Sequence, residues 1–114
     1  MKHRSTPLIL FTALVGLGLA TPVGAFDADA AKATARQNNC FKCHAVGKSK
    51  DGPDWLKIAA KYRGKPDAVE RIIFHITSGE LAKFPDGHQE EHKIAKTSDP
   101  AELQNLAEWI LSLE

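Results

Sequence analysis

The chain has 114 residues, of which 25% are charged, with 15 Lys and Arg against 14 Asp and Glu. A formal net charge of +1 lacks the basic excess that binding to phosphate backbones requires, which argues against nucleic acid as a partner. A chain of this length forms one small domain, near the size at which apolar burial gives marginal stability and a cofactor often contributes.

The first 25 residues have the pattern of a secretory signal peptide. Lys2 and Arg4 precede the uncharged run LILFTALVGLGLA at 8–20, and small residues follow up to Ala25. The apolar run is shorter than the roughly 20 residues of a membrane-spanning helix, so a cleaved signal is favoured over a retained anchor. The prediction is a signal peptide at 1–25 and one domain at 26–114, exported to the periplasm and not inserted in the membrane after cleavage.

Four helices are predicted in the remaining chain, where strand signals are poor. Residues 27–37 are rich in alanine, with acidic residues first and basic residues last, as the helix dipole prefers. Because its apolar side chains are small, another helix could approach this one closely. Apolar residues at helical spacing predict three further helices, at 54–62, at 67–78 and from Asp99 to near the C-terminus.

Between the third and fourth helices, the long polar segment Glu80 to Ser98 is predicted to lack secondary structure. It contains Pro85, Gly87 and two histidines. A structureless connection of this length in a small domain is more often functional than idle.

The stretch NCFKCHA at 39–45 contains both cysteines of the chain. A disulfide redox pair would normally open a helix beside a βαβ unit, for which no strands are predicted. A structural zinc site usually has four protein ligands, and a second cysteine pair is missing. Cys-x-x-Cys-His is instead the attachment pattern of c-type haem. The prediction is one haem c bound covalently through Cys40 and Cys43, with His44 ligating the iron.

With this motif, the chain resembles the class I cytochromes c of bacteria. The similarity covers essentially all of residues 26–114, and its most specific parts are CFKCH, the Gly52-Pro53 pair and LAEWI at 106–110. It implies an all-α fold of about four helices around one haem, and a protein that transfers electrons and is not an enzyme. It also implies that His44 is the proximal ligand and that the Pro53 carbonyl accepts its other ring N–H.

Trp109 matches the aromatic position of the family's last helix, which packs across the first helix. The family's partner on the first helix is often aromatic. Here the first helix offers only Ala31, Thr34 and Ala35.

The largest departure from the family concerns the distal iron ligand, which is usually a methionine in the loop before the last helix. Met1 is the only methionine, and it lies in the predicted signal peptide. Alignment of the family pattern on Trp109 places His92 at the distal position, with His88 or an open, water-bound iron as alternatives. His75 lies on the helix that matches one beside the haem edge, and a propionate contact is expected for it.

His88 to His92 also match H-x-x-E-H, an inverted zinc-protease signature. That chemistry needs a helix to bring both imidazoles to one metal, a third protein ligand and a substrate cleft. Pro85 and Gly87 lie just upstream, so the match is interpreted as chance.

Lysines 42, 48 and 50 follow or overlap the haem motif. They are either ordinary solvated charges or a rim on which an acidic redox partner docks. The predicted function is a soluble periplasmic monohaem cytochrome that carries single electrons between redox proteins with bis-histidine ligation. The alternative is a haem protein that binds NO, CO or O2 after its distal ligand is displaced.

Overall fold

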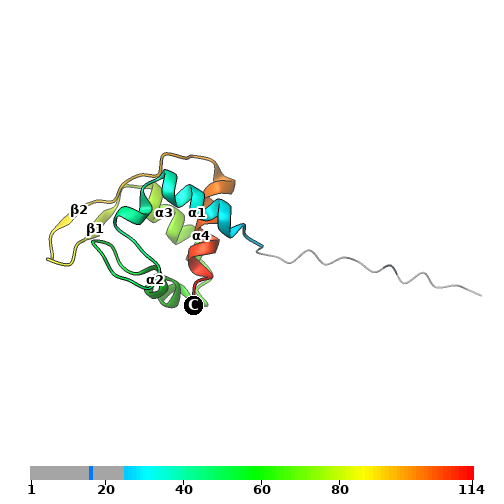
Figure 1. Cartoon of the computed structure of the whole chain (residues 1–114), viewed down its shortest axis with the longest axis horizontal. Coiled ribbons are helices and arrows are strands. Elements are labelled where there is room, and N and C mark those ends of the chain that lie inside the picture. The colour runs from blue at the N-terminus through cyan, green and yellow to red at the C-terminus, as the bar shows by residue number, and fades with distance from the viewer. Residues whose placement is uncertain (1–15, 17–24) are drawn as a thin grey trace, which may run out of the picture.

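The computed structural model describes residue 16 and residues 25–114, so the predicted signal peptide lies almost entirely outside the described residues. The described chain forms four α-helices, a short 3-10 turn (η1) and a two-stranded sheet (Figure 1). Their bounds are α1 Ala28–Gln37, η1 Cys40–Lys42, α2 Trp55–Tyr62, α3 Ala68–Thr77, β1 Leu81–Lys83, β2 Gln89–Glu91 and α4 Pro100–Leu111. The four predicted helices are confirmed. No helix in this part of the chain is both long and apolar enough to cross a membrane.

Aspartates begin three of the helices by capping free backbone N–H groups. Asp27 accepts from the N–H of Ala30, and Asp99 accepts from that of Ala101, at 3.0 and 2.9 Å. Asp54 accepts from Leu56 at 2.9 Å and also from Gly47 at 2.8 Å. The cap of α2 therefore also holds the loop that follows the cysteine motif.

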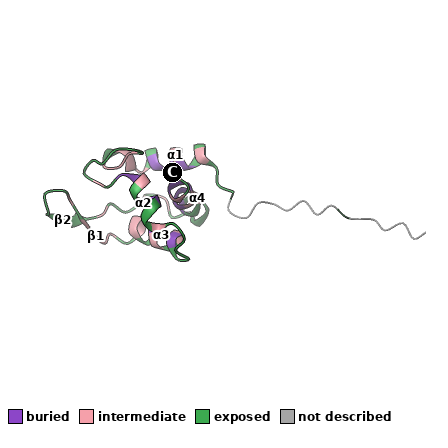
Figure 2. Ribbon diagram, turned by 90° about the horizontal axis from the view of Figure 1, so that it is seen from below, coloured by how far each residue is buried: buried purple, intermediate pink, exposed green. Residues whose placement is uncertain are grey.

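The core lies around α4, which packs against α1, α2 and α3 (Figure 2). Ala31 and Ala35 of α1 and Ala107 of α4 are all 0% exposed, which confirms that small side chains let these helices approach closely. Trp109 packs against an aromatic residue of α2 and not of α1. Its ring and that of Trp55 form a T-shaped pair with centroids 5.5 Å apart.

The segment predicted to lack structure contains an antiparallel hairpin, so that prediction was wrong for residues 81–91. Strands β1 and β2 pair with Leu81 opposite Glu91, and the hairpin projects from the helices (Figure 1). The turn is closed by the N–H of Phe84, which donates to the His88 carbonyl at 2.9 Å. Each strand has three residues, and most of these residues are exposed. The alternation of apolar and polar residues that reveals a half-buried strand is therefore missing.

Beyond the hairpin, the chain is fastened back onto the helices. The N–H of Ala95 donates to the Ile76 carbonyl at 2.8 Å, and that of Lys96 donates to the Asn38 side chain at 2.6 Å. The residues between β2 and α4 are thereby held against α3 and the end of α1.

Candidate functional site

One tight turn after α1 presents both thiols and an imidazole. Asn39 has a left-handed backbone with φ 57°, which reverses the chain at the end of the helix. The carbonyl of Cys40 then accepts from the N–H groups of Cys43 and His44, at 3.2 and 3.0 Å. Both cysteines are free thiols and half-buried. Two nucleophilic sulfur atoms and a possible metal ligand therefore come from a single turn.

Neither the Cys40 thiol nor the surrounding fold suits a disulfide redox pair. Burial raises the pKa of the Cys40 thiol, and the neighbouring Cys43 adds to this effect. A reactive Cys-x-x-Cys pair has a lowered thiol pKa. The strands of the described chain form only the hairpin, without the βαβ unit that such a pair accompanies.

The His44 ring is fixed from two sides. Its Nδ1 lies 2.9 Å from the Pro53 carbonyl oxygen, which can only accept, so Nδ1 carries the proton and Nε2 keeps a free lone pair. The ring also stacks on Trp55, with centroids 5.4 Å apart and planes 16° from parallel. The predicted hydrogen bond to Pro53 is therefore present. The role of Trp55 was not predicted, since helical periodicity indicates only that it is buried.

Gly52 closes the loop against the same ring. Its N–H donates to the Cys43 carbonyl at 2.7 Å. A Cβ at this position would lie 2.5 Å from His44 Cε1 and 2.9 Å from the Cys43 carbonyl oxygen. The space beside the imidazole therefore admits only a glycine.

His92 is the histidine that the fold brings toward His44. Their ring centroids are 6.2 Å apart and their planes 41° from parallel. Nδ1 of His92 donates to the Lys93 carbonyl at 2.9 Å, so its Nε2 is also free. Metal–imidazole bonds are about 2 Å long, and the spacing leaves room for one metal ion between the rings. Burial lowers the pKa of both histidines, which favours the neutral form that binds metals.

His75 lies beside His92, with ring centroids 4.1 Å apart. Its Nδ1 donates to Glu80 Oε1 at 2.5 Å, and Glu80 also accepts from Arg71 at 2.9 Å. The propionate contact of His75 stays a prediction. Glu80 and Arg71 were not predicted as part of the site, because no local motif connects them to it.

The structure separates His88 from this group. His88 lies at the hairpin turn, where its ring stacks on Phe84 at a centroid distance of 4.4 Å. Nδ1 is bound by Asp86, and Nε2 lies 3.3 Å from a carboxylate oxygen of Glu90. Asp86 raises the pKa of His88 and so favours the protonated form, which cannot bind a metal. Residues 89–91 between the two histidines form a strand, so the zinc-protease match lacks its helix.

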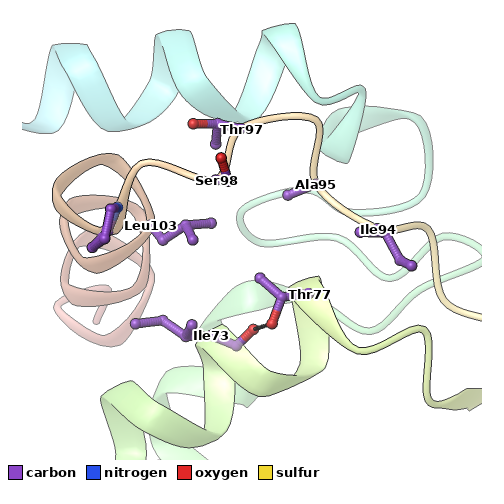
Figure 3. Close-up of a pocket in the computed structure, with 8 residues that line it drawn as sticks. Ile73, Thr77, Ile94, Ala95, Thr97, Ser98 and Leu103 are labelled. Atoms are coloured by element: carbon purple, nitrogen blue, oxygen red, sulfur yellow. Dashed lines mark hydrogen bonds between the residues drawn. The ribbon is translucent and has the colours of Figure 1, made fainter.

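A mostly apolar pocket lies between α3, the start of α4 and the segment after His92 (Figure 3). Its lining has no acid, base or thiol and consists of Ile73, Thr77, Ile94, Ala95, Thr97, Ser98, Pro100 and Leu103. This pocket therefore offers no acid, base or thiol, in contrast to the turn with the two cysteines and the adjacent histidines.

The sequence profile of the family described as Cytochrome c matches residues 28–114. The chain belongs to the cytochrome c family. It is 38% identical over 88 residues to cytochrome c-552 of Nitrosomonas europaea, which covers 77% of this chain and 79% of that protein. It is 31% identical over 80 residues to cytochrome c-552 of Hydrogenobacter thermophilus, covering 70% of this chain and 78% of the relative.

Solved structures agree with this assignment. The class 1 cytochrome MtoD from Sideroxydans lithotrophicus has 61% identity and a TM-score of 0.74, covering 77% of this chain and 97% of that one. Wild-type cytochrome c552 of Nitrosomonas europaea has 32% identity and a TM-score of 0.58, covering 77% and 100%. The resemblance to small class I cytochromes and the mainly helical fold are both confirmed.

As a cytochrome c, the protein has one haem c, attached covalently through Cys40 and Cys43. The residues present fit that group, because one turn carries both free thiols and an imidazole whose Nε2 has no hydrogen-bond partner in the described chain. The roles of His44, Pro53, His75 and His92 toward the haem remain predictions. The absence of a methionine after Met1 is a property of the sequence.

Proposed function

We propose that this cytochrome c carries single electrons between redox proteins in the periplasm, with His44 and His92 as the two axial ligands. The observation that carries the proposal is the pair of imidazoles, 6.2 Å apart, each with Nδ1 bound to a backbone carbonyl and Nε2 free. When bound, the haem supplies a one-electron couple. The protein holds both ligands in place, so little needs to rearrange when the electron arrives or leaves.

The anchoring of His92 supports a carrier over a protein that binds small ligands. The N–H of His92 donates to the Glu80 carbonyl at 2.9 Å, and three residues later Ala95 is bound to Ile76. A displaceable ligand would need a segment that swings away, and these bonds hold the segment at His92 itself and three residues after it. An imidazole in place of the usual thioether also removes the ligand that raises the reduction potential of Met/His cytochromes. A midpoint potential below that of Met-ligated relatives is therefore expected.

Carbon monoxide distinguishes the two functions. The dithionite-reduced protein is expected to show no shift of its Soret band over minutes under CO, because both axial positions are filled. The matched control is the His92→Ala variant, which should bind CO within the mixing time. A rapid Soret shift in the unaltered protein would overturn the carrier assignment and favour a ligand-binding haem protein.

A basic rim is proposed as the docking site for acidic redox partners. Lys42, Lys48 and Lys50 are exposed, and Val46 among them is 47% exposed. Nζ of Lys50 donates to the Phe41 carbonyl at 2.6 Å, which holds its charge over the turn that carries the cysteines. A rim of this kind would steer association through long-range attraction.

Charge reversal tests the rim. Lys42→Glu combined with Lys48→Glu should slow bimolecular electron transfer to an acidic redox protein roughly tenfold at low salt. The difference should disappear at high salt, where exposed charges are screened. Lys32→Glu combined with Lys65→Glu changes the net charge equally, away from the motif. Stopped-flow rates that fall equally in both double variants would show that only net charge matters.

We further propose that residues 1–25 are a signal peptide and that residues 26–114 are the exported domain. N-terminal sequencing of the haem-containing protein from a periplasmic extract tests this. A first residue of Phe26 is expected, and a protein that retains Met1 in the membrane fraction would contradict it.

A further inference from the structure

We infer that Glu80 is a positioning residue for the distal imidazole. Its carbonyl binds the backbone of His92, while its carboxylate holds His75, whose ring lies against that of His92. The inference rests on the proposed function, in which His92 ligates the iron. It adds that Glu80 sets the orientation of the ligand ring.

The backbone of Glu80 joins the end of α3 to the stretch of chain that carries His92. Gly79 ends the helix with φ +70°, a conformation that L side chains rarely adopt. A Cβ added at Gly79 would lie 3.5 Å from the Ile94 side chain, so the end of α3 and the segment after His92 lie next to each other. The Glu80 carbonyl then accepts from the His92 N–H at 2.9 Å. The position of the His92 backbone is therefore determined by the end of α3.

The side chain of Glu80 is held by two residues of α3. Arg71 and His75 are four positions apart and so lie on the same face of the helix. Nη2 of Arg71 lies 2.9 and 3.1 Å from the two carboxylate oxygens, and His75 donates to one of them at 2.5 Å. The Glu80 side chain is 23% exposed. This network fixes the rotation of the His75 ring, which would otherwise be free on a helix surface.

The His75 ring in turn limits the His92 ring. Their centroids are 4.1 Å apart and their planes 46° from parallel, so the two rings are in contact and His75 restricts the rotation of His92. A second restraint on the His92 ring is the hydrogen bond that its Nδ1 donates to the Lys93 carbonyl. The angle of 41° between the His44 and His92 planes therefore depends on the contact with the His75 ring as well as on the hydrogen bond to the backbone.

The angle between two axial imidazole planes determines the electron paramagnetic resonance signal of low-spin ferric haem, which makes the orientation measurable. The frozen oxidised protein is expected to give one narrow low-spin signal. In Glu80→Ala, His75 loses its anchor, so the largest g value should shift and its signal broaden or split. Glu80→Gln should keep the narrow signal, because its amide oxygen can still accept from His75.

His75→Ala should broaden the signal as Glu80→Ala does, and the double variant should resemble His75→Ala, since both residues act through one ring. The matched control is Glu90→Ala, which removes the carboxylate beside His88 and should leave the signal unchanged. Covalent haem content and helix content are measured in each variant, so that misfolding is distinguished from a changed orientation of the His92 ring. If Glu80→Ala alone failed to fold, His75→Ala would still give the test.

A parent-like narrow signal in both Glu80→Ala and His75→Ala would overturn the inference. Lowered resistance to urea with unchanged g values would assign Glu80 a purely structural role, which also overturns it. A parent protein that is high-spin when oxidised would instead contradict the bis-histidine ligation of the proposed function. The two failures are therefore distinguishable.

Discussion

His92→Ala is expected to convert the low-spin oxidised protein to a high-spin or water-ligated form that binds CO readily when reduced. The haem should stay attached, because Cys40, Cys43 and His44 are unchanged. The physical reason is that the His92 ring lies near that of His44, with centroids 6.2 Å apart, and that its Nδ1 is bound to a carbonyl, which leaves Nε2 free. Absorption spectra of the oxidised and reduced protein measure the change.

Two further variants make this test sharp. His88→Ala should keep the low-spin spectrum, since both nitrogens of His88 lie against carboxylates at the exposed turn. His92→Ala should also be made together with His75→Ala, because His75 lies 4.1 Å from His92 and could replace it as a ligand. A low-spin spectrum in this double variant, with a high-spin spectrum in His88→Ala, would show that His88 is the ligand.

Gly52→Ala is expected to destabilise the protein and to disturb the proximal side of the iron. The added methyl would lie 2.5 Å from His44 Cε1 and 2.8 Å from its Nδ1. The ring cannot retreat easily, because Trp55 stacks on it at 5.4 Å and Pro53 binds its Nδ1. The backbone oxygen of Cys43, at 2.9 Å, blocks the other direction. Overpacking of this kind costs about 1–3 kcal/mol.

Thermal unfolding followed in the Soret region measures this effect, with an expected loss of roughly 4–8 °C for each kcal/mol in a small domain. Gly64→Ala is the control. Gly64 has φ +77°, and no atom lies within 4 Å of the place that an added methyl group would take, so its cost of about 1–2 kcal/mol comes from backbone strain alone. It should leave the haem spectrum unchanged, whereas Gly52→Ala should alter it. A Gly52→Ala protein with the parent's melting temperature and spectrum would show that the loop moves aside freely.

The identity of the protein and its helices followed from contiguous residues. Cys40, Cys43 and His44 lie in one short stretch of the chain, so their turn forms from local hydrogen bonds to the Cys40 carbonyl. Asp27, Asp54 and Asp99 cap helices within two or three residues of themselves. Short-range interactions of this kind leave a pattern in the sequence, and the pattern predicted both the helices and the haem attachment.

The hairpin left no such pattern, because its strands are short and exposed and bury no apolar face. Its pairing follows from the turn at Gly87, which has φ +92°, and from the attachment of the chain at both ends. The tryptophan pair in the core was also missed. Apolar periodicity identifies a buried face, but the choice of Trp55 as the partner of Trp109 depends on how α2 and α4 are placed.

The sequence by itself determined which histidines were available, since no methionine follows Met1. Only the tertiary structure decided which of them lies beside His44, because the approach of His92 to His44 depends on bonds formed by distant segments, from Glu80 to His92 and from Ile76 to Ala95. The same bonds leave His88 at an exposed turn. The role of Glu80 likewise arises from three contacts made at once, with Arg71, His75 and His92. Contacts between residues far apart in the chain depend on how the helices and loops pack, and the spacing of residues within one segment does not predict that packing.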